Sequence, residues 1–177
     1  SLHPEHKTTG TLALRIPGWV KTYCVFRNGE KIREPKTEKG YLLISGELEQ
    51  EEITLKFDIK PRFVHANPKV RADSGKAALM RGPLVYCLEE TDNGSNLASV
   101  FVDTGQELSE HYEPKLLGGT TVICLKGKKI TESCWDDDTL YRECKTELED
   151  IELKAVPYCH WGNRTTGEML VWIKELL

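Results

Sequence analysis

The sequence predicts an all-β protein, an antiparallel β-sandwich divided into two small β subdomains with little helix. Short segments in which apolar and polar residues alternate recur along the chain, a period typical of strands with one face in water. Glycine, proline and asparagine separate these segments at short intervals, which favours antiparallel strands joined by tight turns. No segment combines a capping box with a 3.6-residue apolar period, so we expect no long helix.

The first half of the chain contains five predicted strands. In residues 11–16 three aliphatic side chains alternate with polar or small ones until Pro17-Gly18 ends the strand. Residues 23–27 form the next strand, and Asn28-Gly29 predicts a two-residue hairpin because a type I′ turn needs positive φ at both central positions. We expect a return strand at 31–33. The last two predicted strands cover 40–44 and 53–60, of which the latter alternates most regularly.

A subdomain boundary is predicted after residue 72. Pro61 and Asn67-Pro68 interrupt strand pairing because proline has no N–H to donate, and Arg71–Gly75 is polar and ends in glycine. We therefore predict a first β-sandwich portion at 1–72 and a second at 73–177. Five strands are few for a closed two-layer core, so we expect the first portion to be completed by strands upstream of this sequence.

Six further strands are predicted in the second half. They cover residues 77–80, 84–88, 97–102, 120–125, 151–156 and 169–173. We expect a short helical turn within Ser109–Leu117. The segment Met169–Leu177 suits either a buried strand or a final helical turn, and its five apolar residues from Met169 to Ile173 favour the strand.

Composition and charge indicate an ordinary globular chain. Of 177 residues, 39% are hydrophobic and 29% charged, enough apolar residues for a folded core. The net charge of −4 comes without a clustered basic face, which argues against a nucleic-acid partner. No apolar run reaches the roughly 20 residues that span a bilayer. We expect a soluble protein without a membrane partner, and the sequence does not distinguish a cytoplasmic from a periplasmic location.

The six cysteines show no metal-ligand or redox spacing. They are Cys24, Cys87, Cys124, Cys134, Cys144 and Cys159. None forms a Cys-x-x-Cys pair, and three lie in strongly apolar predicted strands, so we favour buried free thiols over disulfides or metal ligands. Zinc would need ligands brought together from distant positions, because His111 and His160 have no neighbour at ligand spacing.

Paired carboxylates are the first candidates for hydrolytic chemistry, and their spacing argues against it. Neighbouring residues on a strand point to opposite faces, so Glu89-Glu90 and Glu51-Glu52 cannot converge on one substrate. We expect one glutamate of Glu89-Glu90 to be salt-bridged and the other to face water. The same geometry separates Cys159 from His160 as a nucleophile and base, and Asp136–Asp138 is interpreted as a solvated loop rather than a calcium site.

The segment Tyr158–Arg164 is the strongest candidate for a binding surface. Tyr158 and Trp161 offer flat rings on which a sugar can stack, with the polar side chains of Asn163 and Arg164 beside them. Aromatic residues also fill sandwich cores and cover joints with neighbouring domains. We therefore name these four residues as a candidate carbohydrate or interdomain surface, and we predict no catalytic, cofactor-binding or metal-binding residue.

Three motifs carry a resemblance to a known family. Leu14–Trp19, Ala66–Asn93 and Val156–Arg164 together resemble the C-terminal β-rich region of bacterial beta-L-arabinofuranosidases, glycoside hydrolase family 127, long catalogued as a domain of unknown function. The resemblance implies a retaining hydrolase with a cysteine nucleophile, zinc held by cysteines and a glutamate, and a separate acid/base glutamate. Those motifs belong to an (α/α) barrel upstream, so none of these residues is assigned here and no cofactor is expected in this fragment.

The leading hypothesis is that the chain is a non-catalytic β-sandwich module that packs against the missing catalytic barrel. The alternative is an autonomous carbohydrate-binding module for arabinose-containing, plant-type glycans. A third possibility, an enzyme complete in these residues, lacks convergent catalytic groups. If the chain forms a homodimer, we expect the contact at the apolar segment Met169–Leu177.

Overall fold

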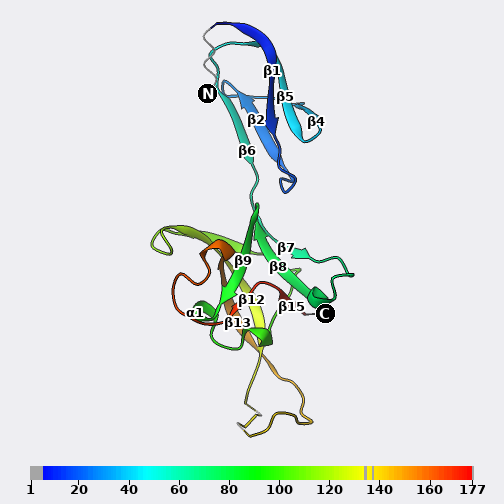
Figure 1. Ribbon diagram of the computed structural model, residues 1–177, viewed down its shortest axis with the longest axis vertical. Helices are drawn as coiled ribbons and strands as arrows, with labels where there is room; N and C mark the ends of the chain where they lie inside the picture. Colours follow the sequence, from blue (N-terminus) through cyan, green and yellow to red (C-terminus); the bar gives the residue numbers. More distant parts are fainter. Residues whose placement is uncertain (1–5, 134, 137, 177) are drawn as a thin grey trace. The chain divides into compact units, whose positions relative to one another are not determined.

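The chain folds into two compact β units in the computed structural model (Figure 1). The structure describes residues 6–133, 135, 136 and 138–176. Unit 1 runs to Lys60 and unit 2 starts at Pro61. Strands dominate both units, most of them paired antiparallel, which confirms the predicted all-β sandwich class.

Two three-stranded antiparallel sheets make up the described part of unit 1. The first sheet has the order β1 (Thr8–Arg15), β5 (Tyr41–Leu48), β4 (Lys36–Glu38), and the second has the order β3 (Glu30–Lys31), β2 (Tyr23–Arg27), β6 (Ile53–Phe57). Val25, Leu42 and Ile44 form the buried core, with half-buried aliphatic side chains around them. In β1, β2, β5 and β6 the predicted alternation thus places one apolar face of each sheet in the core. β4 was not predicted from the sequence.

The hairpin between β2 and β3 turns at the predicted residues. Asn28 and Gly29 have φ of 50° and 83°, the left-handed values that a type I′ turn requires. The return strand is short and covers only Glu30–Lys31. The Asn28-Gly29 pair in the sequence therefore predicted this hairpin turn correctly.

In unit 2 the strand pairings form a closed circuit. The sheet order is β14 (Met169–Leu170), β9 (Leu84–Glu89), β13 (Leu148–Pro157), β12 (Thr120–Ile130), β10 (Val100–Val102), β15 (Ile173–Glu175), β8 (Lys76–Arg81), β7 (Pro61–His65). A further pairing joins β8 to β9, and β11 (Ser109–Glu113) pairs with β12. Because β8 pairs with β9 as well as with β15, the six strands β9, β13, β12, β10, β15 and β8 form a closed ring of pairings. The only parallel pair among the described strands is β10 with β15.

All six strands of this circuit contribute to one core. It contains Leu79, Tyr86, Leu88, Leu97, Val100, Val102, Ile123, Leu125, Leu153, Ala155 and Ile173. Gly127 on β12 is required by this packing, because a Cβ there would lie 2.5 Å from Leu153 Cδ1 and 3.0 Å from the Phe101 carbonyl oxygen. The opposite sheet face carries a smaller buried cluster of Cys87, Val122 and Val156.

The remaining elements of unit 2 are short helical turns. They are η1 (Arg71–Asp73), α1 (Glu90–Asn93), η2 (Leu97–Ser99) and η3 (Tyr158–His160). No helix in the described part of the chain is long and apolar enough to cross a membrane.

The structure differs from the sequence-based boundary and from some local predictions. The division falls between Lys60 and Pro61 rather than after residue 72, because β7 pairs with β8 over five residues and so belongs to unit 2. Ser109–Glu113 is a strand and not a helical turn, since it pairs with β12 from Ser109↔Cys124 to Glu113↔Thr120. The single strand predicted at 169–173 is instead two short strands, β14 and β15, separated by a bend at Val171 and Trp172.

Candidate functional site

Two exposed aromatic side chains stand at the end of β13. Pro157 ends the strand, and η3 carries Tyr158 and leads directly to Trp161. Tyr158 is 45% exposed and Trp161 46% exposed. Their rings are stacked with centroids 6.1 Å apart and planes within 16° of parallel. Tyr158 and Trp161 therefore form an exposed, stacked aromatic pair.

A buried carboxylate positions the loop that bears these rings. Glu89, at the end of β9, is 4% exposed. Its Oε1 accepts the Gly162 N–H at 3.0 Å, and its Oε2 accepts Arg164 Nε at 3.1 Å as well as Arg164 Nη2. Gly162 has φ of 75°, a backbone conformation that glycine adopts without strain. Glu89 therefore fixes both the backbone and a side chain of the segment that follows Trp161.

The ion pair extends into a four-residue cluster. Arg164 Nη2 also donates to Asp92 Oδ2, and Lys154 Nζ lies 2.8 Å from Asp92 Oδ1. Burial alone would raise the pKa of the Asp92 carboxyl, but the hydrogen bonds from Arg164 and Lys154 lower it below its ordinary value. The pKa of Arg164 is raised by Asp92 first and by Glu89 next, against the opposing effect of burial. These charges stabilise one another and leave little net charge beside the rings.

The structure separates the four predicted surface residues into two roles. Tyr158 and Trp161 form the exposed pair, whereas the Arg164 side chain is only 18% exposed and engaged by Glu89 and Asp92. Asn163 is exposed and donates from Nδ2 to the His160 carbonyl oxygen at 3.0 Å. Sequence reasoning did not connect Arg164 with Glu89, because the two lie 75 residues apart and no local pattern links them.

The paired glutamates behave as structural groups. Glu89 is the buried, salt-bridged member, as expected, and Glu90 accepts the Glu168 N–H at 2.7 Å from the exposed side. Glu51 is 6% exposed and forms an ion pair with Arg27. Glu110 binds Arg81 Nε at 2.6 Å. Each of these carboxylates faces a fixed partner on its own unit.

The predicted burial of cysteines holds for one of them. Cys87 is buried, and burial raises the pKa of its thiol to about 12, which suppresses the reactive thiolate. Cys24 and Cys124 are half-buried, whereas Cys159 is exposed because it lies in η3 and not in a strand. Cys144 is exposed, so burial was wrong there as well. Cys134 lies outside the described residues.

Histidine and acidic clusters do not assemble a metal site in the described part of the chain. Cys124 Sγ lies 3.9 Å from His111 Nδ1, and His111 Nε2 contacts Glu113 Oε1 at 3.2 Å. These partners bind opposite ring nitrogens and do not converge. No group of three or more His, Cys, Asp or Glu residues described here fits a metal ion, so we assign no zinc ligand. Asp136 and Asp138 are exposed, and Asp137 lies outside the described residues.

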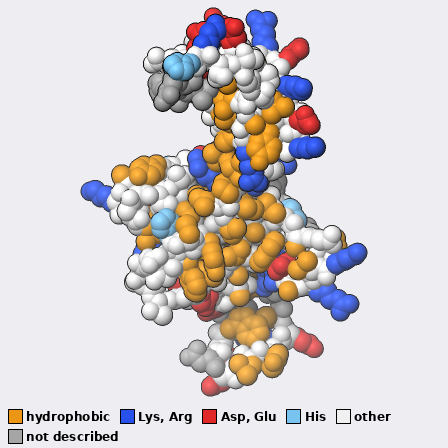
Figure 2. All heavy atoms as spheres, turned by 45° about the horizontal axis from the view of Figure 1, so that its top comes forward, with side chains coloured by type: hydrophobic (Ala, Val, Ile, Leu, Met, Phe, Trp, Pro, Cys, Tyr) orange, Lys and Arg blue, Asp and Glu red, His pale blue; other side chains and the backbone are white. Residues whose placement is uncertain are grey.

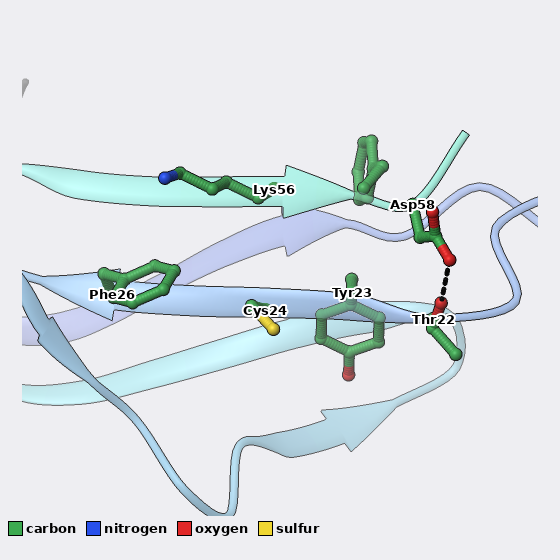
Figure 3. A pocket seen from close by; sticks show the side chains of 7 residues that line it. Thr22, Tyr23, Cys24, Phe26, Lys56 and Asp58 are labelled. Carbon is green, nitrogen blue, oxygen red and sulfur yellow. Dashed lines mark hydrogen bonds between the residues drawn. The ribbon is translucent and has the colours of Figure 1, made fainter. Parts of the chain in front are cut away.

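A shallow depression of about 380 Å³ lies on the outer face of β2 and β6 in unit 1 (Figure 3). Cys24 and Phe26 point to this face, since neighbouring Val25 points into the core. Lys56 Nζ lies 5.3 Å from the Phe26 ring centroid, and Thr22 Oγ1 donates to Asp58 Oδ2 at 3.3 Å. The depression is thus a mainly apolar surface on which Thr22 and Asp58 are already hydrogen-bonded to each other.

A second depression of about 610 Å³ lies in unit 2, beside the long loop between β12 and β13. Trp135, Leu140 and Ile130 line its apolar side, and Asn96 and Glu132 are bonded to each other at 3.1 Å on its polar side. Leu140 is 80% exposed and its neighbour Tyr141 92% exposed. The loop therefore presents large apolar side chains to its surroundings.

Comparison with known proteins gives two family matches that meet at the division between the units. The model of the Glycoside hydrolase family 127 C-terminal domain matches residues 61–174, and that of the Beta-L-arabinofuranosidase, GH127 middle domain, matches residues 1–59. The two matches thus correspond to unit 2 and unit 1.

Individual relatives agree with this assignment. A non-reducing end beta-L-arabinofuranosidase of Bifidobacterium longum subsp. longum is 37% identical over 90% of this chain. A GH127 beta-L-arabinofuranosidase from Geobacillus stearothermophilus T6 has a solved structure that covers 98% of this chain with a TM-score of 0.92 and 44% identity. A solved GH127 beta-arabinofuranosidase covers 97% with a TM-score of 0.84 and 32% identity.

The chain spans only 25% of the Bifidobacterium relative's length and 28% of each of these two solved chains. Its two units follow the middle and C-terminal domain models in order. The chain therefore belongs to glycoside hydrolase family 127, of which it comprises the middle and C-terminal domains.

Proposed function

We propose that this chain is a non-catalytic β-sandwich module that packs against and supports the catalytic (α/α) barrel of a beta-L-arabinofuranosidase-like enzyme. The observation that carries the proposal is the match to the middle and C-terminal domains over about a quarter of the relatives' length. The remaining three quarters of such an enzyme leave ample chain for a separate catalytic domain.

The chemistry of the described carboxylates supports this role. A glycosidase needs two carboxyl groups that face one sugar, one of them able to give a proton. Glu89 and Asp92 instead face Arg164 inside unit 2, and Glu51 faces Arg27 inside unit 1. Carboxylates engaged in this way hold the fold together and are not available to a substrate.

The loop between β12 and β13 is the surface that we propose contacts the catalytic domain. Trp135, Leu140 and Tyr141 are 38%, 80% and 92% exposed, and apolar side chains are visible at the loop, lowest in the view of Figure 2. A long loop that exposes several large apolar residues is typical of an interaction surface. In the longer enzyme, we expect the upstream catalytic domain, which belongs to the same polypeptide, to pack on this loop.

Hydrolysis assays test the first part of the proposal. The 177-residue chain should not release nitrophenol from p-nitrophenyl β-L-arabinofuranoside, whereas the full-length parent enzyme should. Turnover by the purified chain that survives re-purification would show that it is catalytic and would overturn the assignment.

Paired substitutions test the loop. Leu140→Ser with Tyr141→Ser should leave the melting temperature of the isolated chain unchanged, because both side chains are exposed, but should lower that of the full-length enzyme. Val70→Ser, at a 45% exposed position of unit 2 outside the loop, is the matched control and should change neither. Equal melting temperatures for the full-length enzyme and its loop variant would contradict the proposed contact.

A contact between two copies of the chain at Met169–Leu177 stays a prediction. Residues 169–176 are all buried or half-buried within unit 2, so little apolar surface is left there for a partner. Light scattering on the purified chain measures its oligomeric state directly.

A further inference from the structure

We propose that Tyr158 and Trp161 form a stacking platform for a neutral carbohydrate, on a surface separate from the loop assigned above to domain packing. Both rings are nearly half exposed and lie within 16° of parallel. Their centroids are 6.1 Å apart, wider than a full face-to-face overlap, so much of the ring area is accessible. The C–H face of a sugar ring is the apolar, flat surface that matches such a ring.

Hydrogen bonds and ion pairs with buried side chains preorganise the platform. Glu89 accepts the Gly162 N–H directly after Trp161, and Arg164 ties the end of the loop to Glu89 and Asp92. Two further turn bonds close the loop itself, from Trp161 N–H to the Tyr158 carbonyl at 3.0 Å and from Asn163 N–H to the His160 carbonyl at 3.4 Å. A binding surface on a supported loop loses little entropy when a ligand binds.

The charge around the rings points to a neutral ligand. Arg164 is the guanidinium closest in sequence to Trp161, and both of its carboxylate partners lie inside unit 2. A phosphate or an acidic glycan would need that cation, and its guanidinium already binds two carboxylates. A neutral sugar needs only ring faces with nearby hydrogen-bonding groups, and Asn163 provides an exposed amide beside Trp161.

Affinity gel electrophoresis of the 177-residue chain tests the proposal. Migration is compared in native gels that contain arabinan, arabinogalactan, dextran or the acidic polysaccharide polygalacturonate. We expect retardation by at least one neutral polysaccharide and none by polygalacturonate, with a dissociation constant near 1 mM, since two stacked rings give weak binding. Absence of retardation in every neutral gel, or retardation confined to the acidic gel, would overturn the proposal.

Variants assign the binding to the rings. Trp161→Ala and Tyr158→Ala should each lose about tenfold in affinity, while Tyr41→Ala, at a 44% exposed aromatic of unit 1, should bind like the wild type. Circular dichroism checks that each variant is folded. If Trp161→Ala binds as tightly as Tyr41→Ala, the rings are not the site.

The same gels run with the full-length parent distinguish this proposal from the proposed function. Retardation should persist there and weaken with Trp161→Ala by the same factor as in the isolated chain. Retardation by the isolated chain alone would mean that another domain covers the rings in the enzyme, which overturns the platform and leaves the packing role intact. Loss of domain packing in the loop variant, by contrast, would not change sugar binding.

Discussion

Removal of Arg164 is the most direct test of how unit 2 holds its exposed aromatic loop. In Arg164→Ala, the Glu89 and Asp92 carboxylates lose their shared guanidinium while remaining buried, at 5% and 8% side-chain exposure. Breaking a buried pair on one side costs about 3–5 kcal/mol. Asp92 keeps Lys154 at 2.8 Å and Glu89 keeps the Gly162 N–H, so we expect the lower limit of about 3 kcal/mol.

Urea denaturation measures this loss. With a slope of about 2 kcal/mol per molar, a loss of about 3 kcal/mol lowers the unfolding midpoint of unit 2 by about 1.5 M. Circular dichroism is suitable because it follows the strands, and the fluorescence of Trp161 and Trp172 adds a probe within unit 2. Lys128→Ala is the control. It breaks an ion pair with Asp150 that is 41% and 88% exposed, which should shift the midpoint by less than about 0.5 M.

A double variant isolates the charge. If the damage comes from an uncompensated buried carboxylate, Glu89→Gln added to Arg164→Ala should recover part of the lost stability, because a neutral amide is cheaper to bury than a carboxylate. A midpoint for Arg164→Ala no lower than that of Lys128→Ala would refute the reasoning. So would a double variant less stable than Arg164→Ala alone.

Three further predictions concern the core, a thiol and pH. Gly127→Ala should destabilise unit 2 by about 1–3 kcal/mol, because its new methyl group meets Leu153 in the core, whereas Gly18→Ala has nothing within 4 Å and should be close to neutral in a thermal melt. Cys87, with its raised pKa of about 12, should escape thiol labelling at pH 8 until the protein unfolds. Mass spectrometry of labelled peptides measures this, and prompt labelling in native buffer would contradict its burial. Because the pKa of Asp92 is lowered in the folded state, its ionisation contributes stability at pH values above the unfolded-state pKa of about 4, and this contribution is lost as the pH falls toward the folded-state pKa. The difference in unfolding free energy between wild type and Asp92→Asn should therefore narrow on acidification. A difference that widens would contradict the lowered pKa.

Alternation and turn chemistry predicted most strands, and the misses have local physical causes. β2 was placed correctly over Tyr23–Arg27, because its pattern and the following Asn28-Gly29 turn agree. β7 was missed because Pro61 was interpreted as an interruption. Proline is tolerated at the first position of an edge strand, where no ladder N–H is needed, and β7 is such a strand.

Only part of the candidate site could be predicted from the sequence. Tyr158 and Trp161 are three residues apart, so their clustering followed from the sequence alone. The support beneath them did not, since Glu89 reaches Arg164 across 75 residues and only the pairing of β13 with β9 brings these segments together. The carboxylate that sequence analysis examined as a catalyst is the one that holds the aromatic loop in place.

The position of β15 in the sheet has a consequence for how unit 2 is made. Ile173–Glu175 lies between β10 and β8, parallel to β10 and antiparallel to β8. It is the last of the described strands in chain order. During synthesis the growing chain must hold β8 and β10 apart until this strand emerges, with the apolar side chains of both exposed in the meantime. Closing the circuit of paired strands then needs contacts between residues about a hundred positions apart, such as Ile173 and Ala77. Contacts between residues so far apart in sequence form slowly during folding. Unit 2 should accordingly complete its sheet only after Ile173–Glu175 has been made, and until then the unpaired edges of β8 and β10 are exposed to wrong partners.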